Sequence, residues 1–177
     1  LGLSKIPADC RVARAVRLVM EEYRKGTDWK TVRELLVQDS ADLGWFQAPA
    51  NVAFVVLGLL YGEGDFKRSM ILAIDCGDDT DCTGATIGAL MGIMYGTAGL
   101  PADWMQYIGD EIKSICLLRG HNTYPTSCTA LTDAVMELLP VTLTHPRFAT
   151  VGGAAAVALS DHEDLSALDV NALRGTA

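Results

Sequence analysis

Basic residues are scarce in this 177-residue sequence, which has 14 Lys and Arg against 22 Asp and Glu and a formal net charge of -8. Proteins that bind nucleic acid present a face of lysine and arginine to the phosphates, so this balance argues against a nucleic-acid partner. An acidic surface instead favours solubility or the binding of cations.

Paired cysteines are also missing, since the five cysteines include no CxxC pair and their number is odd. The chain does not open with a charged segment followed by an apolar one, the pattern typical of a secretory signal. We therefore expect a reduced, cytoplasmic protein. A chain of this length buries a sizeable core without help from disulfides or a metal.

Alternation of apolar and polar residues is rare, and apolar residues mostly recur at helical spacing, which predicts an all-α fold. Residues 66–74 fit a helix or a strand by periodicity, and we take the helix. Asp9, Asp28 and Thr126 are expected to cap helices, and Gly26 and Pro140 to end them. The expected helices span about 10–25, 29–38, 49–61, 66–74, 81–98, 101–118 and 127–139.

No charged residue occurs between positions 82 and 102. Within this run Gly84, Gly88, Gly92 and Gly96 are four apart, so on a helix they form a stripe that another backbone can approach closely. The run also fits a transmembrane helix by length and GxxxG spacing. We favour a central helix of a soluble domain, because no Lys or Arg flanks the run and aspartates abut it.

Four aspartates, Asp75, Asp78, Asp79 and Asp81, precede this run in the string DCGDDTDCTG. Capping and the helix dipole explain one or two of them. Carboxylates crowded in this way would raise one another's pKa values unless a cation lay among them. Oxygen ligands of this kind suit Mg²⁺, Mn²⁺ or Ca²⁺, so the string predicts a cation site.

The aspartate string also partly fits two known loop patterns and a simple ion-pair arrangement. The calcium-loop pattern fits Asp79 and Asp81 but fails at its twelfth position, where Leu90 stands in place of a glutamate. The letters DTDCT at 79–83 satisfy the DxDxT pattern of phosphotransferases, whose first aspartate is a nucleophile at the end of a hydrophobic strand. Lys67 and Arg68 are the nearest basic residues in sequence and would neutralise the cluster if they folded back.

A more specific pattern covers residues 73–104, AIDCGDDTDCTGATIGALMGIMYGTAGLPADW. It resembles the C-terminal signature of the ADP-ribosylglycohydrolase family, A-x-x-x-G-G-D-T-D-T, an Ala- and Gly-rich helix, then G-x-x-x-I-P-x-x-W. The closing Pro101-x-x-Trp104 agrees, and the resemblance extends over roughly residues 4–139. It implies an all-α orthogonal helix bundle that uses two divalent cations, Mg²⁺ or Mn²⁺, to cleave ADP-ribose from an acceptor.

Carried over by position, the resemblance implies that Asp79 and Asp81 are metal ligands. Cys82 stands where the family has a threonine that supplies an oxygen. A thiol is a poor Mg²⁺ ligand, so the backbone, a water or Thr83 takes that place. Asp78 replaces a usual glycine.

Around these ligands we expect Asp78, and Asp75 with it, to orient Asp79 or a bound water. The resemblance assigns no residue as general acid or base. An early glutamate and a Ser/Thr-Asp-Asp run, which belong to the family pattern, have no counterpart here. Residues 1–140 are therefore expected to be the C-terminal half of the family domain, with little activity alone, in a protein that continues N-terminally.

The composition changes after Pro140, and we expect residues 141–177 to be a linker, a docked arm or the start of a further segment. The partner implied by the resemblance is an ADP-ribosylated protein or an ADP-ribose conjugate, with neither a membrane nor a nucleic acid. Two alternatives are a non-catalytic ADP-ribose-binding or crystallin-like relative, and the DxDxT phosphotransferase.

Among single residues, the three tryptophans, Trp29, Trp45 and Trp104, are expected to anchor the core. The pair Trp45-Phe46 offers rings on which adenine could stack. Asn51, in an otherwise apolar stretch, is expected to be buried and bonded to backbone.

Overall fold

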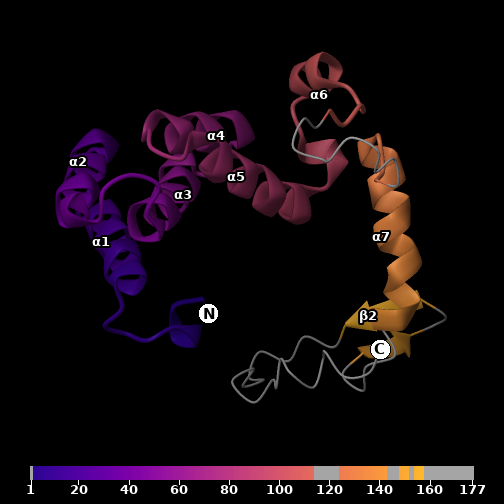
Figure 1. Cartoon of the computed structure of the whole chain (residues 1–177), viewed down its shortest axis with the longest axis horizontal. Coiled ribbons are helices and arrows are strands. Elements are labelled where there is room, and N and C mark those ends of the chain that lie inside the picture. Colours follow the sequence, from indigo (N-terminus) through magenta and orange to yellow (C-terminus); the bar gives the residue numbers. More distant parts are fainter. Residues whose placement is uncertain (1, 114–123, 143–147, 152–153, 158–177) are drawn as a thin grey trace. The chain divides into compact units, whose positions relative to one another are not determined.

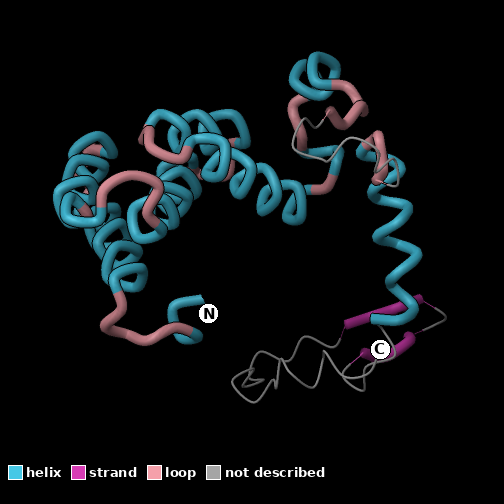
Figure 2. Tube along the Cα trace, in the orientation of Figure 1, coloured by secondary structure: helices cyan, strands magenta, loops and turns pink. Residues whose placement is uncertain are grey.

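A computed structural model describes residues 2–113, 124–142, 148–151 and 154–157 of the protein. These residues are mostly helical (Figures 1 and 2), which confirms the all-α prediction. The α-helices are α1 (Arg11–Lys25), α2 (Trp29–Asp39), α3 (Ala48–Gly62), α4 (Phe66–Asp75), α5 (Thr80–Tyr95), α6 (Ala102–Ile108) and α7 (Cys128–Thr142). Short 3-10 turns lie at η1 (Gly2–Lys5), η2 (Ala41–Leu43) and η3 (Thr97–Gly99).

The chain divides into two compact units, Leu1–Tyr107 and Ile108–Ala177. The second unit contains α7 and an antiparallel pair of strands, β1 (Phe148–Val151) and β2 (Ala154–Val157). Sequence periodicity did not predict these strands, which are only four residues long. The aspartate string lies in the first unit.

Helix α3 is the centre of the first unit, where it packs against α1, α2, α4 and α5 (Figure 1). The helix has no charged residue, and its Phe54 and Leu57 are completely buried. Val19 of α1 and Leu36 of α2 join them in one apolar cluster. Each such side chain contributes about 1.5–3 kcal/mol when it leaves water, so burial around α3 holds the helices of this unit together.

Two glycines of α3 allow α4 to approach closely. A Cβ atom on Gly58 would lie 2.7 Å from the carbonyl oxygen of Ser69, and one on Gly62 would lie 2.7 Å from Ser69 Cα. Only residues without a side chain fit there, so α3 and α4 cross with their backbones almost in contact.

The glycine stripe of α5 is closely packed only in its first half. A Cβ atom on Gly84 or Gly88 would meet Ile74 or Met70 of α4 at 3.2–3.4 Å, whereas one on Gly92 would meet nothing within 4 Å. The expectation of close packing along the whole stripe was therefore wrong. Among the described residues, no helix is long and apolar enough to cross a membrane.

The helix ends partly follow the predicted signals. Asp28 caps α2 by accepting bonds from the N–H groups of Lys30 and Thr31, and Gly26 ends α1 in the left-handed conformation. The prediction for Asp9 was wrong, because Cys10 is the N-cap of α1 and its sulfur accepts from an amide one turn later.

Two further helix predictions were wrong. Helix α6 ends at Ile108, and residues 109–113 are not helical. Helix α7 begins at Cys128, after Ser127 rather than Thr126 accepts a bond from the first turn, and it continues past Pro140 to Thr142. Proline lacks a backbone N–H, so Pro140 removes one hydrogen bond of the helix. Its fixed φ is compatible with a helix, and the helix therefore continues for two more residues.

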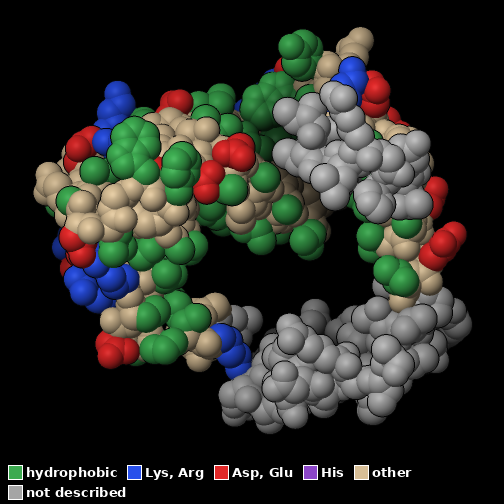
Figure 3. All heavy atoms as spheres, in the orientation of Figure 1, with side chains coloured by type: hydrophobic (Ala, Val, Ile, Leu, Met, Phe, Trp, Pro, Cys, Tyr) green, Lys and Arg blue, Asp and Glu red, His purple; other side chains and the backbone are tan. Residues whose placement is uncertain are grey.

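The tryptophans also differ from the prediction that all three anchor the core. Trp29 packs against the main apolar cluster, and Trp104 meets Phe66 edge to face at 6.0 Å between ring centroids. Trp45, however, is 81% exposed and Phe46 is 68% exposed. Figure 3 shows exposed hydrophobic side chains (green) beside acidic ones (red) on the surface of the first unit.

Candidate metal centre

The loop between α4 and α5 turns the chain within four residues, Cys76 to Asp79. Gly77 has φ 83° and Asp78 has φ 59°, so two consecutive residues are in the left-handed region. Glycine adopts this conformation without penalty, and aspartate is among the few other residues that tolerate it. The usual glycine of the family pattern at position 78 is thus replaced by a residue that still fits the backbone.

Asp79 is the N-cap residue of α5, but its side chain makes no capping hydrogen bond. Asp81 follows in the first turn and is exposed. A carboxylate in the first turn interacts favourably with the helix dipole, which accounts for Asp81 in part. Capping, the usual structural role of a carboxylate at such a position, does not apply to Asp79.

Three side chains converge at this end of α5. One ligand atom each from Asp79, Asp81 and Cys82 lies within 4.8 Å of the other two. Thr83 belongs to a different environment, since its side chain is buried and its hydroxyl donates to the carbonyl of Thr80 at 3.2 Å. Asp75 is the last residue of α4 and is exposed.

Asp78 binds the segment that precedes α3. Its Oδ1 accepts from the backbone N–H of Phe46 at 3.0 Å, and its Oδ2 accepts from Asn51 Nδ2 at 2.7 Å. The Asp78 carboxylate is therefore occupied by contacts within the protein.

The sequence predicted only part of the role of Asn51 at this site. Its amide donates to the carbonyl of Gln47 at 3.0 Å, as a bond to backbone predicts, and also to Asp78. Its Oδ1 accepts from the backbone N–H of Asp79 at 3.2 Å. The signal in the sequence was a lone polar side chain in an apolar helix, which indicated burial but not its partner.

The basic residues nearest in sequence do not neutralise the cluster. Lys67 forms an ion pair with Asp103, and Arg68 forms one with Glu63 at 3.0 Å. The alternative in which these two residues fold back onto the aspartates is therefore not the one that the structure has. Instead, Arg33 of α2 reaches the loop, where its Nε donates to the carbonyl of Cys76 at 2.9 Å.

A cavity of about 290 Å³ lies beside the loop and shares Asp78 with it. Its lining combines apolar side chains of α2 and α3 and the exposed ring of Trp45 with a few polar groups, among them Arg33 and Gln47.

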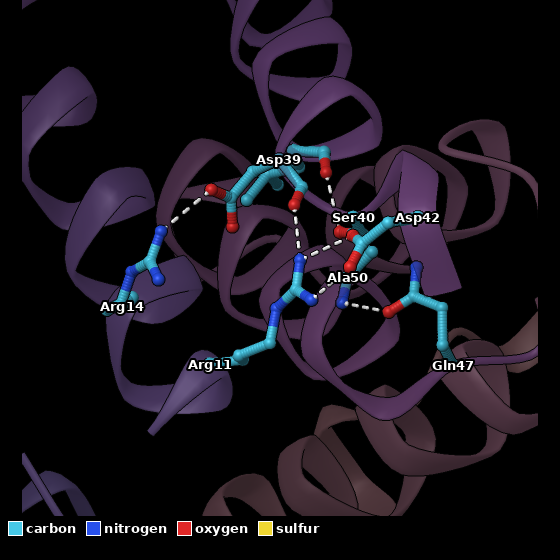
Figure 4. Close-up of polar contacts among 8 residues, drawn as sticks. Arg11, Arg14, Asp39, Ser40, Asp42, Gln47 and Ala50 are labelled. Atoms are coloured by element: carbon cyan, nitrogen blue, oxygen red, sulfur yellow. Dashed lines mark hydrogen bonds and ion pairs between the residues drawn. The ribbon is translucent and has the colours of Figure 1, made fainter. Parts of the chain in front are cut away.

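The α2–α3 connection beside this cavity is tied to α1 (Figure 4). Arg11 donates to both oxygens of Asp42 at 2.7 Å and to the carbonyl of Asp39 at 2.6 Å, while Arg14 pairs with the Asp39 carboxylate. These bonds fix η2 at one end of the connection. The bond from Phe46 to Asp78 fixes the connection closer to α3.

Comparison with known proteins identifies the pattern. A sequence profile described as ADP-ribosylglycohydrolase matches residues 2–123. This chain belongs to the ADP-ribosylglycohydrolase family. It is 33% identical over 52 residues to the ADP-ribosylarginine hydrolase Tri1 of Pseudomonas putida (strain GB-1), a match that covers 29% of this chain and 14% of that relative. No solved structure gives a significant match.

Members of the ADP-ribosylglycohydrolase family are generally metal-dependent hydrolases. The donor set of this member fits that property in part. Asp79 and Asp81 offer the hard carboxylate oxygens that Mg²⁺ and Mn²⁺ prefer, and their ligand atoms are close enough to meet on one ion. These two carboxylates alone do not complete an octahedral site, so waters or groups beyond the cluster must fill the remaining positions.

Cys82 fits less well than the threonine of the ADP-ribosylglycohydrolase pattern. A hydrogen bond to the Asp79 carboxylate is the main cause that raises the pKa of the Cys82 thiol, followed by desolvation and by the charges of Asp79 and Asp81. Sulfur is also a weak ligand for a hard cation.

Proposed function

We propose that this chain carries part of the dinuclear metal site of a hydrolase that cleaves the glycosidic bond between ADP-ribose and an acceptor. The observation that carries the proposal is the convergence of Asp79, Asp81 and Cys82 within a chain of the ADP-ribosylglycohydrolase family. The uncapped Asp79 carboxylate supports it, because that group accepts no bond from the backbone N–H groups of the first turn of α5.

Asp79 and Asp81 would hold Mg²⁺ or Mn²⁺ in this proposal, and neither would carry a proton in the reaction. When bound, the cations would orient the ribose hydroxyls and lower the pKa of a water that attacks C1. Asp78 would orient Asp79 and not bind the ion itself, since its carboxylate is already bonded to Phe46 and Asn51. A general acid or base would come from another carboxylate, which we do not assign.

The substrate class we propose is an ADP-ribosylated protein or an ADP-ribose conjugate. The relative from Pseudomonas putida is an ADP-ribosylarginine hydrolase, so ADP-ribosylated arginine is the first acceptor to test. The exposed rings of Trp45 and Phe46 supply an aromatic surface on which the adenine of ADP-ribose could stack. This surface is linked to the loop, because the backbone N–H of Phe46 donates to Asp78.

Mn²⁺ titration of the chain, followed by the electron paramagnetic resonance signal of the free ion, tests the metal site. We expect Asp79→Ala to weaken binding at least tenfold. Asp103→Ala is the matched control, because Asp103 is another exposed first-turn aspartate and pairs with Lys67 outside the cluster. Equal binding by the wild type and Asp79→Ala would remove the basis of the proposal.

Activity is measured as release of ADP-ribose from an ADP-ribosylarginine peptide with Mn²⁺ present. The match spans only 14% of the hydrolase it resembles, and we propose that these 177 residues alone turn over slowly. Release at the rate of an intact hydrolase would contradict the partial site.

A non-catalytic ADP-ribose-binding relative is the second candidate, favoured by the thiol at position 82. Cys82→Thr restores the oxygen of the family pattern and separates the two. For the hydrolase we expect tighter Mn²⁺ binding and faster release of ADP-ribose in this variant. The binding module would be favoured if the variant bound Mn²⁺ more tightly, bound an ADP-ribose probe as the wild type does, and showed no hydrolysis.

A further inference from the structure

Asn51 and the metal cluster belong to different helices, α3 and α5, but one side chain joins them. Asn51 Nδ2 donates to Asp78 Oδ2 at 2.7 Å, and Asn51 Oδ1 accepts from the N–H of Asp79 at 3.2 Å. The same Nδ2 donates its second hydrogen to the carbonyl of Gln47 at 3.0 Å. Both N–H hydrogens of this amide and its carbonyl oxygen thus have a partner within the protein.

The burial of Asn51 makes these bonds consequential. The side chain belongs to a residue that is 8% exposed, in a helix whose other buried positions are apolar or small. A buried amide without partners is costly, so Asn51 is stable there only while the loop keeps its present shape. Aspartate cannot replace it, because a carboxylate at position 51 would face the carboxylate of Asp78 without a donor between them.

Such support matters because Asp78 and its partner Phe46 both have a positive φ. Asp78 has φ 59°, and Phe46, which donates the second bond to its carboxylate, has φ 56°. Positive φ is unfavourable for residues other than glycine and persists only where surrounding contacts hold it. The bonds from Asn51 and Phe46 to the two oxygens of Asp78 are these contacts.

We propose that Asn51 and Asp78 act as a clamp that positions the Asp79 carboxylate for metal binding. The clamp fixes the backbone of Asp79 through its N–H, while the Asp79 side chain makes no capping bond and lies in the cluster with Asp81 and Cys82. Groups that orient metal ligands in this way commonly change metal affinity by about 10–100-fold when they are mutated. The inference rests on the proposed metal site and assigns Asn51 as a positioning residue, not a ligand.

The test compares Asn51→Ala and Asn51→Asp with the wild type in two measurements on the full chain. Amide hydrogen exchange of Asp79 without metal reports the clamp itself, and we expect exchange at least tenfold faster in both variants. Mn²⁺ titration reports its effect on the site, and we expect about tenfold weaker binding or more. Val52→Ala is the matched control, since Val52 is the next residue of α3 and is exposed.

Asp78→Gly tests the other half of the clamp without disturbing the core. Glycine accepts φ 59° freely, so we expect this variant to fold, to weaken Mn²⁺ binding about tenfold and to speed exchange at Asp79. This variant decides the question if the Asn51 variants do not fold. Asn51→Ala removes no charge, so a loss in both variants is not explained by the charge of Asp78.

The outcomes separate this inference from the proposed function. If Asp79→Ala weakens Mn²⁺ binding and the folded clamp variants bind like the wild type, the clamp is overturned and the metal site stands. If Asp79→Ala binds like the wild type, the metal site and the clamp are overturned together. Weaker binding and faster exchange in the clamp variants, with Val52→Ala unchanged, support the inference.

Discussion

Gly62 and Ser69 lie so close that a Cβ atom on Gly62 would be 2.7 Å from the Cα atom of Ser69. The added Cβ would also overlap the Ser69 hydroxyl and lie 2.8 Å from Ser69 Cβ. A change of rotamer can move the hydroxyl but not Cα or Cβ, so Gly62→Ala must push α3 and α4 apart. We expect this substitution to lower the free energy of unfolding by about 1–3 kcal/mol, measured by urea denaturation.

Gly92→Ala is the matched comparison on α5, where an added Cβ meets nothing within 4 Å. Here the better helix propensity of alanine is the main effect, and we expect a gain of about 1 kcal/mol. If both variants changed stability in the same direction, the assignment of the close contact to Gly62 would be wrong.

Ser69 is fully buried, and its hydroxyl has no hydrogen-bond partner in the described part of the chain. Removing an unsatisfied buried hydroxyl relieves a desolvation cost, so we expect Ser69→Ala to raise the free energy of unfolding by about 1 kcal/mol. Ser40→Ala serves as the control, because the buried Ser40 hydroxyl donates to the carbonyl of Leu36 at 2.7 Å. That variant should be less stable than the wild type, and a loss of stability in both would contradict the prediction.

The pair Arg11 and Asp42 predicts a dependence of stability on pH. The hydrogen bond that Asp42 accepts from Arg11 is the main cause that lowers the pKa of Asp42 below the ordinary value of 3.8. The folded state thus binds this proton less readily than the unfolded state, so the pair stabilises fully above pH 3.8 and less as the pH falls through the folded-state pKa.

We expect Asp42→Asn to be less stable than the wild type at pH 6, with the difference shrinking at acid pH and in high salt. Thermal denaturation at several pH values measures this. In an Arg11→Ala background the same substitution should have little effect, and an undiminished effect there would show that the partner is not Arg11.

Cys76 is completely buried, and its burial raises the pKa of the thiol to about 12. Alkylating reagents attack the thiolate, so Cys76 should resist iodoacetamide in the native protein at pH 8 and react after unfolding. Peptide mass spectrometry follows each site, with the exposed Cys128 as the reactive reference. Labelling of Cys76 as fast as Cys128 in the folded chain would contradict the burial of this loop.

Part of the candidate site was accessible from the sequence because it is contiguous. Asp79 is the N-cap residue of α5 and Asp81 and Cys82 lie in its first turn, so local spacing alone brings their side chains together. The family pattern named the same positions. Thr83 is different, because its side chain is buried and its hydroxyl is bonded to the carbonyl of Thr80.

The contacts that hold the loop were not accessible in this way. Asn51 and Asp78 are 27 positions apart, and Arg33 and Cys76 are 43 apart. Nothing in the spacing of a sequence says which helices will pack, so a lone asparagine indicated only burial. The basic residues closest in sequence, Lys67 and Arg68, in fact pair with carboxylates outside the string.

The sequence by itself determined the all-α class and the two carboxylates of the family motif, because these depend on periodicity and on neighbours along the chain. Only the tertiary structure decided that α3 meets α4 at Gly58 and Gly62, and that Asn51 supports the loop. Close packing and buried hydrogen bonds depend on the three-dimensional meeting of segments, where a backbone contact or an unpaired amide has a cost that no local pattern records.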